Sequence, residues 1–427
     1  MSGVKTNNRL KSRLTSIQVG FFLALRQTRR TSLWTNILVT CIMVLTFLNL
    51  VVVSGILVGL IEGAVEAVKT HYVGDIFIST LKDRGYIEKS QDIIETLKNT
   101  PGVKAITARY IENGTIEADY KIPKKPIELN RKVGTSFAGI DPIAEDEATD
   151  ISDLIIKGEY LSPDDYDEVV VGALLLKQYL DFESPNFPIL ENVDIGSRVR
   201  VEINGNVREV RVKGILKSKV DEIDRRVFFT DKQLRGLIGR YDYNVDEIAV
   251  FLEPRTDAKA VKENLISYGA DKYARVQTQE EAEPKFIKDM KETFNTLGNV
   301  ISSIGLVVAA ITIFIVIFIN AITRRKFIGI LKGIGIDSFA IEAAYVFQSI
   351  FYAVLGSTIG SVIVFFFLKP YISAHPINFP FSDGILVVPL SDTIVRIIVL
   401  LAVTLVAGYI PAKLITRQNT VDAILNR

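Results

Sequence analysis

Four apolar runs without a charged residue constrain the fold of this chain more than any other feature. They comprise residues 33–61, 298–321, 343–368 and 397–412. A helix needs about 20 apolar residues to cross the hydrocarbon core of a bilayer, and the first three runs exceed that length. The fourth is shorter, about 24 Å at 1.5 Å per residue, and we expect Arg396 and Lys413 at its ends to extend outward to water. The sequence therefore predicts four transmembrane helices.

Basic residues are concentrated on one side of these runs. Residues 1–32 contain seven Lys or Arg and no acidic residue, and residues 322–342 and 413–427 also carry an excess of basic residues. Because short loops rich in Lys and Arg stay in the cytosol, we expect a multi-pass protein of the cell (inner) membrane with both termini cytosolic. Residues 1–32 are expected to form an amphipathic lead-in at the membrane surface. The first run is too long for a signal peptide and is expected to be an uncleaved anchor.

The segment between the first two runs mixes strand and helix patterns, and we expect it to fold as a large extracytoplasmic α+β domain. Its strongest local signal is Asn204-Gly205 between two alternating apolar runs, which predicts a β-hairpin. Helices are predicted over residues 90–99 (with Ser90 as the N-cap), 173–180, 231–238 and 258–268. Two stretches with prolines, 121–134 and 181–193, resist assignment and are either binding loops or simple excursions of the chain.

Helical spacing of apolar residues continues past the first run to Tyr72 and begins before the second run, near Pro284. We therefore expect two helices that leave the membrane as stalks, unless Gly298 and Gly305 bend the second one. The predicted organisation is a cytosolic lead-in (1–32), a first transmembrane helix with stalk (33–72), an α+β domain (73–280), a second stalk and transmembrane helix (281–321), a cytosolic coupling loop (322–342), the third and fourth transmembrane helices (343–412) and a cytosolic tail (413–427).

The sequence motifs of common catalytic and phosphate-binding sites are missing from the chain. It contains no G-x-x-x-x-G-K-[ST], H-E-x-x-H, C-x-x-C or G-x-S-x-G, and its only cysteine, Cys41, lies in an apolar run. The three long runs contain no Asp, Glu, Lys, Arg or His, which argues against an ion-coupled carrier. Their polar residues Asn36, Asn49, Asn320 and Gln348 are interpreted as hydrogen-bonding links between helices. We expect no catalytic, metal-binding or cofactor-binding residue and no nucleic-acid partner.

The basic loop after the second run has an unusual composition. It reads Arg324-Arg325-Lys326-Phe327-Ile328-Gly329-Ile330-Leu331-Lys332-Gly333-Ile334-Gly335. Arg324, Arg325 and Lys326 are either a membrane-topology signal only or part of a partner contact, but the apolar residues of the loop are too many for a solvated loop. We predict a short amphipathic helix that places apolar side chains in a groove of a cytosolic partner, with Gly333 and Gly335 turning the chain back toward the third span.

These features together resemble a known family. The order of one span, a large outer domain and three spans is similar to the permeases of the MacB/FtsX/LolC type, the mechanotransmission class of ABC transport systems. The basic loop resembles the family signature R-x-R/K-E-I-G-I-L-K-A-I-G-A, with Phe327 in place of the usual Glu and Gly333 in place of the common Ala. The following helix has Gln348 where the family usually has Glu. Further similar segments are Gly139-Ile140-Asp141-Pro142, Val212-Lys213-Gly214-Ile215 and Tyr409-Ile410-Pro411-Ala412-Lys413.

The resemblance implies a non-catalytic permease subunit, a MacB-like periplasmic core and a cytosolic ABC ATPase dimer that binds ATP and Mg in separate chains. It also implies a second permease subunit, identical or different. An extracytoplasmic adaptor, chaperone or hydrolase is a further implied partner beside the bilayer. The residues implied in ATPase coupling are Arg324, Arg325, Lys326, Phe327, Gly329, Ile330, Leu331, Lys332, Gly333 and Gly335, with Pro411 and Lys413 at the cytosolic end of the fourth span.

Two functions follow from the resemblance. In the first, ATP hydrolysis by the partner moves the outer domain, which exports or extracts an amphiphilic cargo such as a lipoprotein, lipid, peptide or drug. In the second, an FtsX-like regulator activates a cell-wall hydrolase and moves no cargo. The outer domain of about 230 residues favours the first, because the outer domain of FtsX is smaller.

Overall fold

The computed structural model describes residues 2–30, 32–120, 132–180, 189–375, 377–379, 382–384 and 386–417. The chain divides into two units. One, here called the helical unit, comprises residues 1–61, 290–377 and 384–427. The other, here called the sheet unit, comprises residues 62–289 and 378–383.

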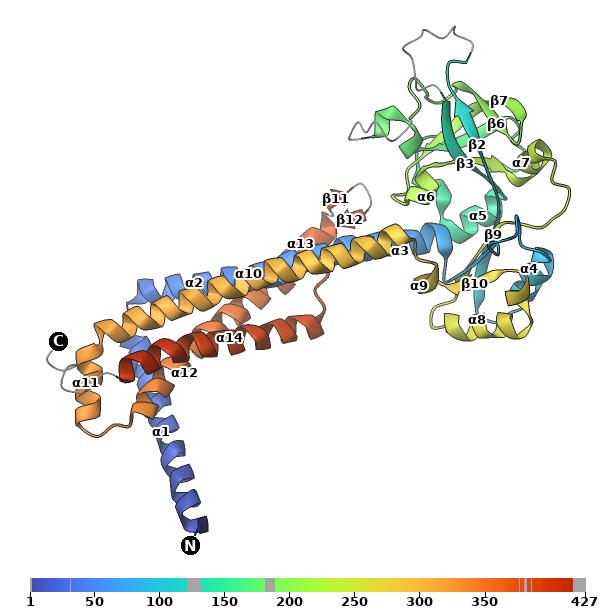
Figure 1. Ribbon diagram of the computed structural model, residues 1–427. Coiled ribbons are helices and arrows are strands. Elements are labelled where there is room, and N and C mark those ends of the chain that lie inside the picture. The colour runs from blue at the N-terminus through green and yellow to red at the C-terminus, as the bar shows by residue number, and fades with distance from the viewer. Residues whose placement is uncertain are drawn as a thin grey trace. The chain divides into compact units, whose positions relative to one another are not determined.

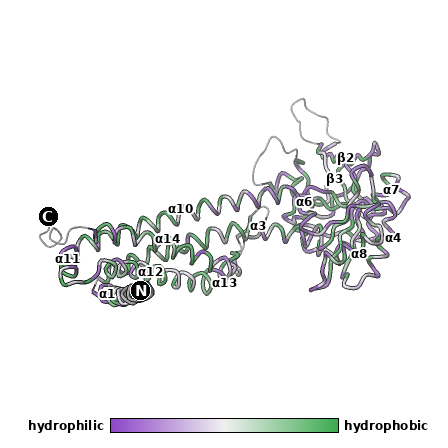
Figure 2. The backbone as a smooth tube through the Cα atoms, turned by 60° about the horizontal axis from the view of Figure 1, so that its bottom comes forward, coloured by the Kyte–Doolittle hydropathy of each residue, from purple (hydrophilic) through white to green (hydrophobic). Residues whose placement is uncertain are grey.

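Four helices are long and apolar enough to cross a membrane, which confirms the four predicted spans (Figure 1). They run over Leu33–Val73, Lys285–Thr323, Ser338–Ala374 and Leu390–Thr416. Figure 2 shows hydrophobic residues along most of α10, α12 and α14, whereas most residues of the sheet unit are hydrophilic. The chain therefore has the composition of a multi-pass membrane protein with a water-soluble α+β domain.

The spans are continuous helices that include short π-helical segments. The first consists of α2 (Leu33–Leu48), η1 (Asn49–Val53), α3 (Ser54–Val68) and η2 (Lys69–Val73), of which η1 and η2 are π-helical. The second is α10 (Lys285–Thr323), so the helix expected from near Pro284 is unbroken at Gly298 and Gly305. The third consists of α12 (Ser338–Val362), π-helical η7 (Ile363–Leu368) and α13 (Lys369–Ala374), and the fourth is α14 (Leu390–Thr416).

Helix α12 lies at the centre of the helical unit and packs against α1 (Ser2–Arg30), α2 and α14. Gly356 and Gly360 of α12 permit the close approach to α2, because a Cβ at Gly356 would lie 2.5 Å from the Cβ of Met43. Small residues commonly allow helices to pack closely in membranes. The α1 side chains Ile17, Phe21, Phe22 and Leu25 are exposed, while the Phe21 ring packs edge-on against Phe347 of α12 at 5.5 Å. These features fit the expected amphipathic lead-in.

A polar chain links α2 and α12, as predicted for Asn36 and Gln348. The Tyr352 hydroxyl donates to Asn36 Oδ1 at 2.5 Å. Gln348 Nε2 donates to the Tyr352 hydroxyl at 3.4 Å, and Asn36 Nδ2 donates to the Thr28 carbonyl at 3.0 Å. The buried polar atoms of this link therefore satisfy one another.

Arg396 of α14 does not extend to water as expected from the sequence. Its Nη1 donates to the carbonyls of Leu50 at 2.8 Å and Val51 at 3.3 Å, and its Nη2 donates to Ser54 Oγ at 2.7 Å. Leu50 and Val51 belong to η1, where the change from α- to π-helical hydrogen bonding disturbs the regular pairing of carbonyls. The guanidinium supplies donors to this irregular turn, and that pairing keeps Arg396 half-buried against η1 and α3.

The sheet unit is built on one mixed sheet, and its described residues contribute ten strands in the order β10-β1-β9-β2-β3-β8-β5-β7-β4, with β6 paired to β2 and β7. The strands are β1 (Ile76–Ser79), β2 (Val103–Glu117), β3 (Lys132–Ile140), β4 (Ile155–Gly158), β5 (Glu168–Gly172), β6 (Arg198–Ile203), β7 (Asn206–Leu216), β8 (Arg226–Thr230), β9 (Glu247–Leu252) and β10 (Arg275–Thr278). The long strand β2 joins the two halves, because it pairs with β9 at its start and with β3 and β6 toward its end.

Helices cover this sheet at several places. They are α4 (Ser90–Lys98), α5 (Pro142–Thr149), α6 (Asp221–Asp224), α7 (Asp231–Ile238), α8 (Ala258–Ser267) and α9 (Gln279–Ala282). Two short paired strands, β11 (Ile377–Phe379) and β12 (Ser382–Gly384), follow the third span in the chain. Apolar residues of the strands and of α4, α7 and α8 form one buried core.

The predicted hairpin is present between β6 and β7. Asn204 and Gly205 have φ values of 51° and 80°, and two consecutive positive φ angles are what a type I′ turn requires. Helix α7 coincides with the predicted range, and α4 and α8 lie within a residue of theirs.

Three local predictions in the sheet unit were wrong or incomplete. Ser90 is the first residue of α4 and not its N-cap, which is Lys89 with φ 54°; the Ser90 hydroxyl instead bonds the backbone of Tyr243 and Val245. The helix predicted over 173–180 is two separate 3₁₀ turns, because Leu176 between them pairs with Leu190. Strand β3 begins within the unassigned stretch 121–134. Residues 121–131 and 181–188 lie outside the described residues.

Gly356 gives a direct test of the α2–α12 packing. We expect Gly356→Ala to lower the free energy of unfolding by about 1–3 kcal/mol, because the added methyl overpacks the Met43 backbone. Gly298→Ala is the control, since its Cβ would meet Leu57 and Ser54 only at 3.6 Å. Thermal unfolding of the two purified variants in detergent checks this, and equal unfolding temperatures would contradict the packing described here.

Candidate functional sites

The basic loop forms a helix, α11 (Arg325–Gly333), followed by a Schellman turn. The N–H of Ile336 donates to the Leu331 carbonyl and the N–H of Gly335 donates to the Lys332 carbonyl, both at 3.0 Å. This pair of bonds requires a left-handed residue, and Gly335 supplies it with φ 95°. The glycine expected to turn the chain is thus the residue that ends α11 and points it toward α12.

Apolar side chains of α11 and of its C-cap residue, Ile334, lie on two sides of the helix. Ile328 and Leu331 are buried in the core of the helical unit, and Gly329 is buried beside them. Phe327, Ile330 and Ile334 are exposed by 48%, 45% and 71%. The sequence grouped Leu331 and Gly329 with the contact residues, but the structure assigns them to internal packing. The outward side is therefore Phe327, Ile330 and Ile334, with Ile334 an addition to the predicted set.

The remaining predicted residues of this region differ in their exposure. Lys326, Gly333 and Gly335 are exposed, Arg324, Arg325, Lys332 and Lys413 are partly buried, and Pro411 is buried within α14. Lys413 places its ammonium 5.1 Å from the centre of the Tyr409 ring.

Helix α11 is fixed to the ends of two spans by a polar link that the sequence did not reveal. Lys332 Nζ donates to the Thr416 carbonyl near the end of α14 at 2.9 Å. The Thr416 hydroxyl donates to Glu342 Oε1 near the start of α12 at 2.6 Å. A cation at the last carbonyls of a helix is favoured by the helix dipole. The link makes α11 a positioned element and not a free loop.

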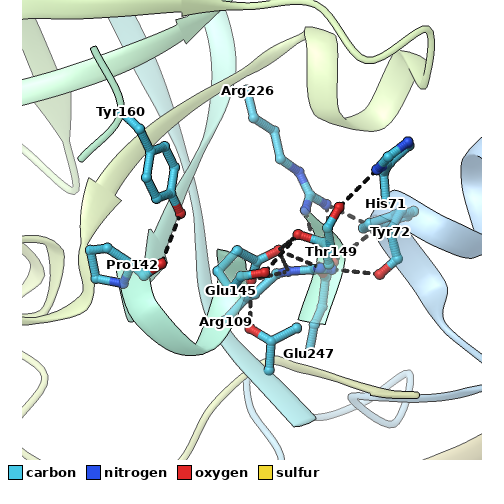
Figure 3. Close-up of polar contacts among 10 residues, drawn as sticks. His71, Tyr72, Arg109, Pro142, Glu145, Thr149, Tyr160, Arg226 and Glu247 are labelled. Atoms are coloured by element: carbon cyan, nitrogen blue, oxygen red, sulfur yellow. Dashed lines mark hydrogen bonds and ion pairs between the residues drawn. The ribbon is translucent and has the colours of Figure 1, made fainter. Parts of the chain in front are cut away.

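A second candidate site lies in the sheet unit, where Tyr72, Arg109, Glu145, Arg226 and Glu247 form a buried charge cluster (Figure 3). These residues come from five separate elements: η2, β2, α5, β8 and β9. Arg109 and Glu145 are only 2% and 1% exposed. Charged side chains at such depth occur in proteins when they are paired and hydrogen-bonded.

Arg109 is the centre of this cluster. Its Nη2 lies 2.7 Å from Glu145 Oε1, its Nε donates to both Glu145 oxygens at 3.1 and 3.0 Å, and its Nη1 donates to the Tyr72 carbonyl at 2.8 Å. The Thr107 hydroxyl donates to Glu145 Oε2 at 2.5 Å. Every nitrogen of the guanidinium therefore has an acceptor, and one of these acceptors is backbone at the end of η2.

Tyr72 and Glu247 complete the cluster with a second arginine. Arg226 Nη2 donates to Glu247 Oε1 and to the Tyr72 hydroxyl, each at 3.0 Å. The Tyr72 hydroxyl in turn donates to Glu247 Oε1 at 3.1 Å. Arg109 lies 3.8 Å from Glu247 and so joins the two halves. Two guanidinium groups face two carboxylates, so the charges of these four side chains cancel.

The ion pairs keep these groups charged despite their burial. Burial by itself would raise the pKa of Glu247, but Arg226, Arg109 and the Tyr72 hydroxyl outweigh it and hold the pKa below its usual range. Burial by itself would lower the pKa of Arg226, but Glu247 raises it above the ordinary value. A burial penalty compensated by pairing is the usual balance in a buried ion pair.

The motif Gly139-Ile140-Asp141-Pro142 explains how Glu145 reaches the cluster. Asp141 is the N-cap of α5, and its Oδ1 accepts hydrogen bonds from the N–H groups of Ile143 at 3.0 Å and Ala144 at 3.3 Å. Pro142 occupies the first helical position, where its missing N–H costs nothing. The turn therefore starts a helix whose fourth residue is the partner of Arg109.

The charge cluster links elements of the sheet unit, and α11 exposes an apolar surface. Among the described residues, no group of three or more His, Cys, Asp or Glu side chains is placed to hold a metal ion. The two candidate sites contain charge-assisted hydrogen bonds within the protein and an apolar outward side on α11, which suit positioning and partner binding.

The charge cluster predicts a large difference between buried and exposed ion pairs. We expect Glu145→Gln to destabilise the sheet unit by about 3 kcal/mol, because Arg109 is left buried with an incomplete partner. Glu202→Gln is the control: its pair with Lys132 is 45% exposed on both sides and is worth about 1 kcal/mol or less. Hydrogen exchange of peptides from β2 and α5 measures both, and equal protection in the two variants would contradict the role given to the cluster.

Comparison with known proteins identifies the family. The MacB-like periplasmic core domain matches residues 38–268, more than half of the chain, and the FtsX-like permease C-terminal domain matches residues 299–420. An uncharacterised ABC transporter permease from Methanocaldococcus jannaschii is 22% identical over 342 residues, which cover 78% of each protein.

Two solved structures are also similar in part. The periplasmic region of MacB from Actinobacillus actinomycetemcomitans has 15% identity and a TM-score of 0.33, over 48% of this chain and 88% of that one. The extracellular domain of the ABC-type transporter YknZ from Gram-positive bacteria has 15% identity and a TM-score of 0.31, over 48% of this chain and 98% of that one. The periplasmic core match precedes the permease match along the chain, as the sheet unit precedes the last three spans. These two matches show that this chain belongs to the MacB/FtsX family of ABC transporter permeases.

Proposed function

We propose that this permease is driven by a separate cytosolic ABC ATPase, which binds ATP and Mg and docks on the outward side of α11. The observation that carries the proposal is the exposure of Phe327, Ile330 and Ile334 on a helix that is anchored at its other side. Three large apolar side chains beside Lys326 form a surface of the kind that a partner groove buries. On this assignment α11 and both termini are cytosolic, and the sheet unit is extracytoplasmic.

The coupling path in this proposal follows helices that are continuous in the chain. Helix α10 runs without interruption from Lys285 to Thr323 and is followed at once by α11. At 1.5 Å per residue its 39 residues extend about 58 Å, well beyond the hydrocarbon core of about 30 Å. Displacement of α11 by the ATPase would therefore be carried along α10 to Lys285, where that helix begins.

The first span supplies a second connection in the same proposal. It ends in η2, whose Tyr72 is held by Arg109 and Arg226 in the charge cluster. A helix fixed in this way cannot turn or slide without breaking the hydrogen bonds that Tyr72 forms with the cluster. The cluster would thus make β2, β8 and β9 follow the movement of the first span.

The proposed cargo is an amphiphile, such as a lipoprotein, lipid, peptide or drug, handled by the sheet unit with a second permease subunit. What supports this is the lack of any Asp, Glu, Lys, Arg or His in the three long apolar runs, since carriers of ions and protons place ionisable residues there. Depletion of the protein followed by analysis of membrane lipid and lipoprotein distribution tests the proposal. Unchanged distributions together with recovery of a hydrolase on the sheet unit would overturn it.

Ile330 provides the test of ATPase docking. We expect Ile330→Asp to reduce co-purification of the ATPase about tenfold or more, because a charge replaces an apolar contact in the interface. Ile330→Leu is the matched control and should retain binding. Phe327→Asp should behave like Ile330→Asp, since both side chains are exposed and their replacement leaves the packing of α11 unchanged.

A substitution at the neighbouring residue Leu331 distinguishes an effect on ATPase binding from an effect on folding. Leu331 is only 7% exposed, so Leu331→Asp should reduce the amount of folded permease and not only its ATPase binding. Size-exclusion chromatography of the three variants before the binding assay distinguishes these effects. Normal ATPase recovery with well-folded Ile330→Asp and Phe327→Asp would show that the ATPase docks elsewhere.

A further inference from the structure

A groove of about 610 Å³ lies in the helical unit between α2 and α12. Most of its wall is apolar, formed by Ile37, Cys41 and Val44 of α2 and by Leu355 and Ile359 of α12. These side chains succeed one another along both helices, so the groove is elongated in the direction of the spans. Neither the ATPase contact nor the charge cluster uses this surface.

One end of the groove is polar and basic. Thr28, Asn36 and Tyr352 line it, and their polar groups are already engaged in the link between α2 and α12. Arg29 also lines this end and is exposed, and Arg26 and Arg30 are exposed on the same part of α1. Within the described part of the chain, none of the three arginines forms an ion pair with a carboxylate, and residues 1–32 contain no acidic residue at all.

We propose that this groove binds an anionic glycerophospholipid. One acyl chain lies along Ile37, Cys41, Val44, Leu355 and Ile359, and the phosphate lies against Arg29 with Arg26 and Arg30 nearby. The groove is apolar along its length and ends at cationic residues, so it is complementary to an acyl chain that leads to an anionic phosphate. Basic residues next to a span attract anionic lipids, and each contributes about fivefold in affinity. The proposal rests on the membrane location of the helices and is independent of the ATPase and the cargo.

Charge complementarity favours a lipid over a second copy of the chain as the occupant. A second copy packed here about a two-fold axis would bring its own acid-free basic segment to the same place. Arginines of the two copies would then face each other without an acidic partner from either segment, and like charges repel. An anionic lipid neutralises these charges and fills the apolar length.

Two residues that occur once in the chain report on the groove. Trp34, the only tryptophan, is 81% exposed and precedes Ile37 by three positions, so it lies on the same side of α2. Cys41, the only cysteine, is exposed and lines the groove. The full-length protein can therefore be studied without introducing a label.

The experiment measures quenching of Trp34 fluorescence by lipids brominated on the acyl chain. Full-length protein in phosphatidylcholine bilayers is titrated with brominated phosphatidylglycerol or with brominated phosphatidylcholine. We expect phosphatidylglycerol to quench at a severalfold lower mole fraction, and Arg29→Gln to reduce this preference about fivefold. Alkylation of Cys41 by N-ethylmaleimide should be slowed by phosphatidylglycerol and not by phosphatidylcholine.

Matched variants separate binding in the groove from general attraction to a basic surface. Val44→Phe fills the apolar part of the groove and should abolish the preference, whereas Leu45→Phe, at an exposed position outside it, should keep it. Persistence of the preference in folded Val44→Phe would overturn the proposal, as would equal quenching by both lipids.

If Val44→Phe fails to fold, the Cys41 alkylation rates decide: equal protection by both lipids refutes the site. Absence of quenching together with Cys41–Cys41 disulfide formation between copies would assign the groove to a subunit interface and also refute it.

Discussion

A backbone carbonyl exposed to lipid has no water with which to form a hydrogen bond, and this constraint governs the helical unit. Straight α-helices satisfy it internally, but the first span contains the π-helical segment η1 (Asn49–Val53). Arg396 makes that irregularity tolerable, because its guanidinium donates to Leu50 and Val51. The charge and the helix defect thus stabilise each other, and together they join the first and fourth spans.

The two units use polar and charged side chains in different ways. In the helical unit, polar side chains form separate short links between helices, such as Tyr352 with Asn36 and Lys332 with Thr416. In the sheet unit, two arginines and two glutamates form one continuous cluster. Buried ion pairs contribute little net stability relative to apolar packing, but disruption of one partner is costly. The cluster therefore specifies the positions of η2 and α5 on the sheet more than it adds to the stability of the unit.

Local sequence signals predicted much of the fold and the presence of the α11 helix. The four spans, the Asn204-Gly205 hairpin and α7 follow from periodicity and turn chemistry within a few residues. The pairing of Arg109 with Glu145 and of Arg396 with η1 depends on contacts between residues far apart in the chain, which no local pattern reveals. The α11 helix was predicted, but its orientation was not: Phe327, Ile328, Ile330 and Leu331 are all apolar, so the pattern alone could not show which side faces inward.

The anchoring of α11 bears directly on how well it could serve as a docking element. A free loop would lose conformational entropy when a partner ordered it, and that loss would reduce the affinity. The Schellman turn at Gly335 and the bond from Lys332 to Thr416 order α11 before any partner arrives. The same contacts join α11 to the end of α14, and Thr416 passes the connection to Glu342 of α12. A force applied to Phe327 or Ile330 would therefore act on α10, α12 and α14 together, which is the requirement for a helix that transmits movement rather than one that only holds a partner.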